Sequence, residues 1–223
     1  MSMTLAFPLL SEPIVFRENE IPILVVEHEA ELRRLLFMLQ QQIDGLSGEF
    51  VLAEDYAPVE LSKKAFLVTD PFALDFESKK ISGKIDQEAI AAGTVFADTF
   101  QKILDELNKL ACNISTMLDF EATFSELEDW KFFLKYLNFH IDRYSLDFPS
   151  QLIEFLKLQR RFFGKKLGIF YNIKAILTTE ELRLLYETIQ YEKLQVLFIE
   201  DSQRRYISSN ESVVIIDPDF CVF

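Results

Sequence analysis

The chain has 223 residues, 49% of them hydrophobic, and a formal net charge of −13, which allows one large domain or a domain with an insertion. Because the surface as a whole repels nucleic acid and acidic membranes, any contact with DNA must depend on a local group of basic residues or on bound cations. No secretory signal opens the sequence and no apolar run approaches the ~20 residues of a membrane span, so we expect a soluble cytoplasmic protein.

The first seventy residues predict strands and one helix. Residues 23–26 (ILVV) form a continuous apolar run, which is typical of a strand buried on both faces. Apolar residues at helical spacing follow from Glu29 to Ile43, and Gly45 ends the pattern. Residues 65–68 (AFLV) predict a second buried strand.

The middle of the chain predicts one long helix. Its apolar residues recur every three or four positions and would line one face of a helix about 45 Å long. They are Ile85, Ala89, Ala92, Phe96, Phe100, Ile103, Leu107, Leu110 and Ile114. Such a stripe needs a partner, either a second helix or another subunit. A second amphipathic helix is predicted by Leu127, Trp130, Leu134 and Leu137.

The last third predicts a strand, a helix and another strand. Residues 167–171 (LGIFY) and 196–199 (VLFI) are the strands, and Leu182, Leu185 and Ile189 mark the helix between them. Thr178 and Glu181 have the spacing of a capping box at its start. This order predicts a parallel βαβ unit. We therefore predict an α/β head of residues 1–74 and 149–223, with residues 75–148 inserted as an extended α-helical leg.

An acidic segment between residues 119 and 129 is a candidate metal site. Oxygen ligands without nitrogen or sulfur suit a hard cation such as calcium. The spacing is not that of an EF-hand, because Phe124 stands at the position of the loop glycine. Alternatively, Ser125 and Glu128 form a capping box and the other acids lie near a helix N-terminus. The candidate ligands are Asp119, Glu121, Glu126, Glu128 and Asp129.

Two groups of basic residues are candidates for contact with DNA phosphates. The first group occupies a stretch without acids and comprises Lys157, Arg160, Arg161, Lys165, Lys166 and Lys174. Part of it has another interpretation, since bases before Gly164 suit the C-terminus of a helix. The second group has acids between its members and comprises Lys63, Lys64, Lys79, Lys80 and Lys84.

Two short segments suggest a nucleotide-hydrolysing enzyme, but both are incomplete. Residues 196–201 (VLFIED) resemble the apolar strand ending in acids that supports magnesium in P-loop ATPases, and residues 82–84 (SGK) resemble a fragment of the phosphate loop. The fragment lacks the upstream glycine and the following Ser or Thr. Residues 27–31 (EHEAE) would also repel phosphate after the first strand. No nucleophile–base pair accompanies His28 or His140, so no catalytic residues are predicted.

Several segments, in the same order along the chain, resemble the type II-A CRISPR-associated adaptation protein family. They are residues 7–14 (FPLLSEPI), 23–27 (ILVVE), 66–70 (FLVTD), 165–172 (KKLGIFYN), 177–178 (LT) and 196–200 (VLFIE). The resemblance covers essentially the whole chain, including the long inserted helix.

This resemblance implies a head related to P-loop NTPases but without the phosphate loop. It further implies a non-catalytic homotetrameric ring that binds calcium and threads double-stranded DNA ends, independently of their sequence, during spacer acquisition. The implied partners are the CRISPR integrase complex and the effector nuclease. An alternative is a degenerate nucleotide-fold protein that acts as a structural scaffold for other CRISPR proteins.

Overall fold

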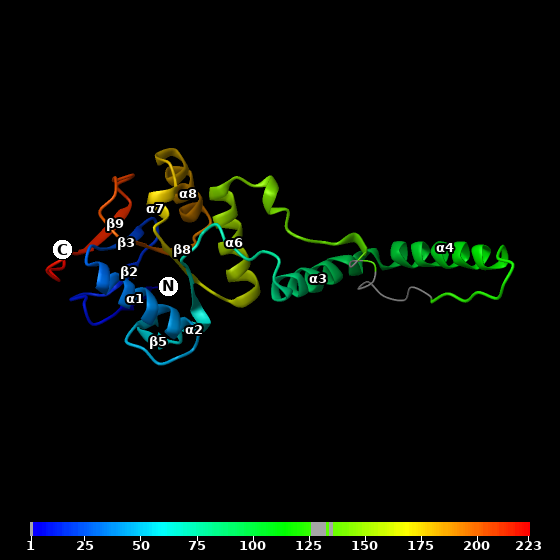
Figure 1. Cartoon of the computed structure of the whole chain (residues 1–223), viewed down its shortest axis with the longest axis horizontal. Coiled ribbons are helices and arrows are strands. Elements are labelled where there is room, and N and C mark those ends of the chain that lie inside the picture. The colour runs from blue at the N-terminus through cyan, green and yellow to red at the C-terminus, as the bar shows by residue number, and fades with distance from the viewer. Residues whose placement is uncertain (1, 126–132, 134–135) are drawn as a thin grey trace. The chain divides into compact units, whose positions relative to one another are not determined.

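A computed structural model describes residues 2–125, 133 and 136–223 of the chain (Figure 1). The chain folds into two compact units, which we call the head (Met1–Leu74 with Arg143–Phe223) and the leg (Asp75–Asp142). Residues 143–148, which the sequence analysis assigned to the leg, belong to the head. There the Arg143 Nη1 atom donates a hydrogen bond of 3.1 Å to the Leu74 carbonyl oxygen.

The head is built on a five-stranded parallel sheet, which confirms the predicted α/β fold class. The strand order is β6 (Ala65–Val68), β7 (Leu167–Tyr171), β8 (Gln195–Glu200), β3 (Ile21–Val26) and β9 (Glu211–Ile216). Both ends of the chain contribute strands to this sheet, as predicted. The predicted βαβ unit is also confirmed, since β7 and β8 pair in parallel and α8 (Thr179–Tyr191) connects them. The edge strand β9 was not predicted.

One face of this sheet packs against α1 (Glu29–Ile43) and a second, smaller sheet. The smaller sheet is antiparallel, in the order β2 (Ile14–Phe16), β1 (Met3–Ala6), β4 (Val51–Glu54) and β5 (Ala57–Val59). Alternate strand residues such as Leu24, Val26, Leu167 and Ile169 join Leu35 of α1 in the same buried apolar cluster. The short helix α2 (Leu61–Lys64) leads directly into β6.

The opposite face packs against α6 (Phe148–Phe163) and α8 (Figure 1), and the short helix α7 (Ile173–Ile176) follows β7. The Phe66 ring of β6 meets the Phe155 ring of α6 edge to face, with the ring centroids 5.7 Å apart. A Cβ atom on Gly168 would lie 2.4 Å from a methyl carbon of the buried Leu156, so a larger residue at this position would have to displace that side chain of α6.

Residues 79–116 of the leg form two helices where the sequence analysis predicted one long helix. They are α3 (Lys79–Gly93) and α4 (Ala97–Thr116), separated by the 3₁₀ turn η1 (Thr94–Phe96). The prediction of one unbroken helix was therefore wrong. Gly93 is a weak helix former, and both the amide and the hydroxyl of Thr94 donate to the Ala91 carbonyl, which closes a tight turn. The predicted apolar stripe continues across the break.

The second predicted helix of the leg falls mostly outside the described residues, where Leu127, Trp130 and Leu134 lie. Phe133 is described, and its ring centroid lies 5.4 Å from that of Phe100. None of the helices in the described part of the chain is both long and apolar enough to cross a membrane.

Candidate nucleic-acid interface

Four lysines from the two predicted basic groups meet at one edge of the parallel sheet. Lys63 and Lys64 come directly before β6, and Lys165 and Lys166 come directly before β7. These strands are neighbours whose first residues pair, and the Lys166 amide donates a hydrogen bond of 2.7 Å to the Lys64 carbonyl oxygen. The amino ends of both strands therefore lie at the same edge. We call these four lysines the basic cluster.

The C-terminus of α6 brings Lys165 and Lys166 to this edge. Gly164 adopts the left-handed conformation (φ 67°), and its amide bonds the carbonyl oxygens of Arg160 and Gln159. Such a glycine ends a helix sharply and turns the chain. Only Lys165 and Lys166 then separate the helix end from β7, so both are held close to the sheet.

The ammonium groups of the cluster have different environments. Glu54 Oε2 lies 3.0 Å from Lys166 Nζ and 3.6 Å from Lys64 Nζ, whereas Lys63 pairs at 2.7 Å with the exposed Glu60. The Lys165 Nζ atom donates to the carbonyl oxygen of Ser62. Partial burial lowers the pKa of Lys165.

The remaining members of the first predicted group divide between two places. Lys157 on α6 forms an ion pair of 2.8 Å with Glu192, and Arg160 donates to the backbone carbonyls of Glu192 and Lys193. Arg161 lies exposed in the last turn of α6. Lys174, by contrast, is buried, with its Nζ atom 2.8 Å from Glu211, so it is not available to a macromolecule.

The second predicted group is divided between the head and the leg. Lys63 and Lys64 belong to the head, whereas Lys79, Lys80 and Lys84 lie on α3 of the leg. Within the described residues, these three lysines form no ion pair shorter than 4.0 Å. Lys79 and Lys80 are exposed.

Sequence reasoning missed two further bases at the same edge of the sheet. Arg17 and Lys193 precede β3 and β8, and with Arg160 and Lys166 they line a cavity of about 260 Å³. Glu18 also lines this cavity and lies 3.3 Å from the Lys193 Nζ atom. Each of these bases stands shortly before a buried strand, and this is the signal that the sequence offers. That they lie close together follows only from the order of the strands in the sheet.

At the opposite edge of the sheet, β3 is followed by an acid, Glu27. Only Glu27 and His28 separate β3 from α1, so no phosphate loop is present there. His28 caps α1, because its Nδ1 atom accepts the amide of Glu31 at 3.2 Å. Residues 82–84 lie inside α3 and form no loop either. This edge is therefore unsuited to a nucleotide phosphate.

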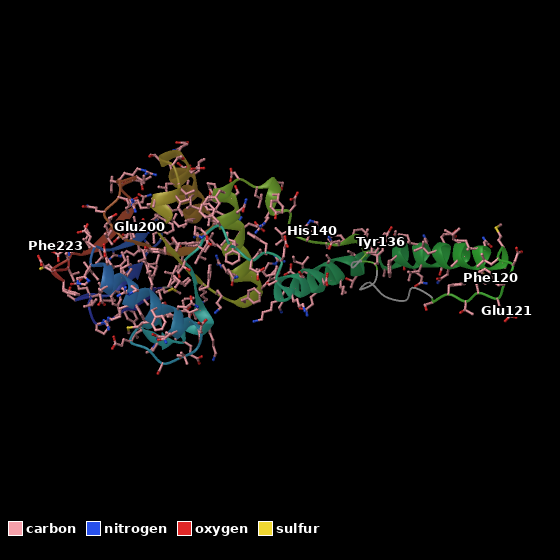
Figure 2. All side chains as sticks on the ribbon, viewed as in Figure 1. Phe120, Glu121, Tyr136, His140, Glu200 and Phe223 are labelled. Atoms are coloured by element: carbon pink, nitrogen blue, oxygen red, sulfur yellow. The ribbon has the colours of Figure 1, made fainter. Side chains whose placement is uncertain are left out.

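A buried charge network lies at the end of β8, and the sequence analysis did not identify it. Glu200 is fully buried inside the head (Figure 2), and its Oε1 atom accepts the Lys174 amide at 2.9 Å. The Oε2 atom lies 3.6 Å from Arg204 Nε, beside a cavity of about 50 Å³. Burial raises the pKa of Glu200 to about 7, although the Lys174 amide and the Arg204 guanidinium oppose that rise.

The structure leaves the predicted calcium site untested. Asp119 and Glu121 are exposed in the segment that follows α4, where Figure 2 labels Glu121. Glu126, Glu128 and Asp129 lie outside the described residues. Within the described part of the chain, no three Asp, Glu, His or Cys side chains are placed to hold a metal ion. Two carboxylates are too few for calcium, which takes about six to eight oxygen ligands.

These features define a class of protein: an α/β head on a parallel sheet without a phosphate loop, combined with an inserted helical unit. The family described as "CRISPR-associated protein (Cas_Csn2)" matches residues 42–220. The chain therefore belongs to this CRISPR-associated family, as the sequence resemblance predicted. Among curated proteins, none matches the chain significantly.

Similar solved structures include an ATP-binding cassette and a part of an ABC transporter complex. A nucleotide-free cassette has a TM-score of 0.48 at 12% identity, over 98% of this chain and 88% of that one. The cbiO1 protein of Clostridium perfringens, part of the ABC transporter complex cbiONQ, has a TM-score of 0.42 at 13% identity, over 86% and 70%. At these scores, the matches add nothing to the architecture described above.

Proposed function

We propose that this chain is a non-catalytic protein of CRISPR spacer acquisition that binds the ends of double-stranded DNA. In this proposal it acts as a calcium-dependent homotetrameric ring and associates with the integrase complex and the effector nuclease. Family membership supports the CRISPR role. The observation that carries the DNA-binding role is the basic cluster, which gathers four lysines at one edge of a sheet in a chain of net charge −13.

The chemistry of the cluster favours contact with phosphates rather than with bases. Lysine ammonium groups are point charges that satisfy phosphate oxygens without reading the base edges. Duplexes of any sequence should therefore bind alike. Elsewhere the acidic surface repels the DNA backbone, so the duplex would be steered toward the few basic positions.

The exposed face of α4 supports assembly through the leg. Ile103, Leu107, Leu110 and Ile114 recur at helical spacing, and their side chains are all exposed in the single chain. A continuous apolar face of this length is uncommon on a monomer and typical of a protein interface. A ring would also multiply one small basic cluster by its number of subunits.

The test compares binding of linear and covalently closed duplex DNA, each with calcium and with chelator. A ring that threads DNA ends should bind the linear form and fail to load onto the closed circle, and chelation should weaken binding. Equal binding to both forms would contradict the ring and leave a surface site only. A scaffold without DNA-binding activity would bind neither form.

Substitution of the cluster tests the interface itself. Replacing Lys63, Lys64, Lys165 and Lys166 by Ala should reduce affinity and flatten the log–log dependence of binding on salt by about 0.9 for each DNA phosphate that is no longer neutralised. The same assay on a Lys79→Ala, Lys80→Ala, Lys84→Ala variant tests whether the lysines of the leg also contact DNA. Arg183→Ala is the control, since this arginine lies on α8 in ion pairs with Glu180 and Glu187. An unchanged salt dependence in the cluster variant would exclude this edge as the interface.

A further inference from the structure

Glu54 is a largely buried acid within contact distance of the basic cluster. Its side chain is 12% exposed, and its Oε2 atom faces both Lys166 Nζ, at 3.0 Å, and Lys64 Nζ, at 3.6 Å. The Oε1 atom is buried and has no hydrogen-bond partner among the described residues. The carboxylate thus holds two ammonium groups with one oxygen while the other oxygen remains unsatisfied.

The backbone around Glu54 fixes this carboxylate in place. Glu54 is the last residue of β4 and pairs with Met3 of β1 and Ala57 of β5. The next residue, Asp55, has a left-handed backbone (φ 47°) and exchanges two hydrogen bonds of 2.8 Å with Ser2. The acid is therefore anchored in the smaller sheet, while the lysines it contacts directly precede strands of the parallel sheet.

We infer that Lys64 and Lys166 form a phosphate-binding site in which the Glu54 carboxylate takes the place of a backbone phosphate while DNA is absent. A carboxylate oxygen and a phosphodiester oxygen accept charge-assisted hydrogen bonds from ammonium groups at similar distances. Because one Glu54 oxygen is buried without a partner, the resident ion pair is incompletely satisfied. A phosphate oxygen can compete with the carboxylate for the lysine ammonium groups, and the cost of leaving the buried Glu54 charge without a partner sets how strongly Glu54 opposes binding. This inference rests on the proposed DNA-binding function and specifies that Glu54 limits the affinity for DNA.

The arrangement has a measurable electrostatic consequence. A lysine whose charge is already neutralised inside the protein releases few counterions from DNA when it binds, so it contributes little to the salt dependence. Glu54 should accordingly lower both the affinity for duplex and the steepness of its salt dependence. Removing this one acid should free two cations of the cluster at once.

The experiment measures the binding of a linear duplex by Glu54→Gln protein over a series of salt concentrations. The log–log salt dependence should become steeper by about 0.9 to 1.8, which corresponds to one or two additional neutralised phosphates. For each additional neutralised phosphate, the ratio of the affinity at 50 mM salt to that at 200 mM salt should increase by roughly 3.5-fold. Circular dichroism establishes that the variant is folded, and Glu54→Met provides a second variant if the buried amide disturbs the head.

Glu60→Gln is the matched control, because it removes the same charge from an exposed pair with Lys63. A double-mutant cycle then tests whether Glu54 acts through its two lysines. In a Lys64→Gln, Lys166→Gln background, Glu54→Gln should have no further effect, whereas the small effect of Glu60→Gln should persist. If Glu54→Gln leaves the salt dependence unchanged, flattens it, or acts equally in both backgrounds, the inference is wrong.

A heparin column separates failure of this inference from failure of the proposed function. Heparin is a sulfated polyanion, so Glu54→Gln should elute at higher salt than the unmodified protein, and this delay should depend on Lys64 and Lys166. If the delay is seen while no variant binds duplex, the anion site stands and the DNA-binding proposal fails. If duplex binds but neither assay responds to Glu54, the proposed function stands and the role of Glu54 is refuted.

Discussion

Replacing Glu200 by Gln should remove a large part of the pH dependence of folding stability. Glu200 is 0% exposed, and burial raises its pKa from 4.5 to about 7. Gln has nearly the same shape and keeps an oxygen that can accept the Lys174 amide, but it does not titrate. The substitution therefore isolates the cost of ionising this side chain inside the head.

The sign of the effect follows from proton linkage. The folded head holds the Glu200 proton up to about pH 7, whereas the unfolded chain loses it near pH 4.5. The favourable contribution is thus complete below pH 4.5 and is lost as the pH rises through 7. At about 1.36 kcal/mol per pKa unit, the loss amounts to about 3 kcal/mol.

Urea denaturation at several pH values from 4.5 to 8 measures this contribution. The difference in unfolding free energy between unmodified protein and Glu200→Gln should change by about 3 kcal/mol across this range, in favour of the variant at high pH. Glu187→Gln, on the exposed face of α8, is the control and should give a difference that varies little with pH. A constant difference for Glu200→Gln would refute the raised pKa and the burial argument behind it.

Two further predictions concern the helices. Thr178→Ala should destabilise the head by about 1 kcal/mol in thermal or urea unfolding, because it removes the hydroxyl that caps the amide of Glu181. Thr188→Ala lies in the same helix but away from the cap and should cost little. Equal losses of stability in the two variants would argue against the capping box. In the leg, Phe100→Ala should cost about 3 to 5 kcal/mol, since Phe100 is 7% exposed. Phe96→Asp should instead leave folding unchanged, because Phe96 is 62% exposed. In light scattering, however, this variant should show a dissociated form of the proposed tetramer. A mass equal to that of the unmodified protein would contradict assembly through the leg.

The parts of the fold that local pattern determines were predictable from the sequence. Strands β3, β6, β7 and β8 are runs of apolar residues buried on both faces, and α8 has both a complete capping box and an apolar stripe. The smaller sheet was harder to predict, because its strands have only three or four residues and its register depends on pairing with distant segments. The break at Thr94 was missed because the apolar stripe continues across it.

The candidate site shows the same division between local and distant information. Lys63 with Lys64, and Lys165 with Lys166, could each be selected from the sequence as basic residues. Their meeting depends on β6 and β7 being neighbours, although about a hundred residues separate them along the chain. Glu54 could not be selected at all, because its importance comes from a third distant segment and from its burial.

The distribution of charge in the head explains how an α/β sheet can favour a polyanion at an unusual edge. In doubly wound folds, phosphate ligands bind outside the carboxyl ends of the strands, where glycine-rich turns and helix N-termini supply amide donors. Here β3 is followed by an acid, Glu27, and only Glu27 and His28 separate β3 from α1, so no loop surrounds a phosphate after this strand. The lysines lie at the amino ends instead. In the proposed function, a phosphate would be repelled by Glu27 at the carboxyl end of β3, and at the amino edge it would meet lysines that contact Glu54. In the proposed function, the direction from which DNA approaches the head is set by repulsion at one end of the strands as well as by attraction at the other.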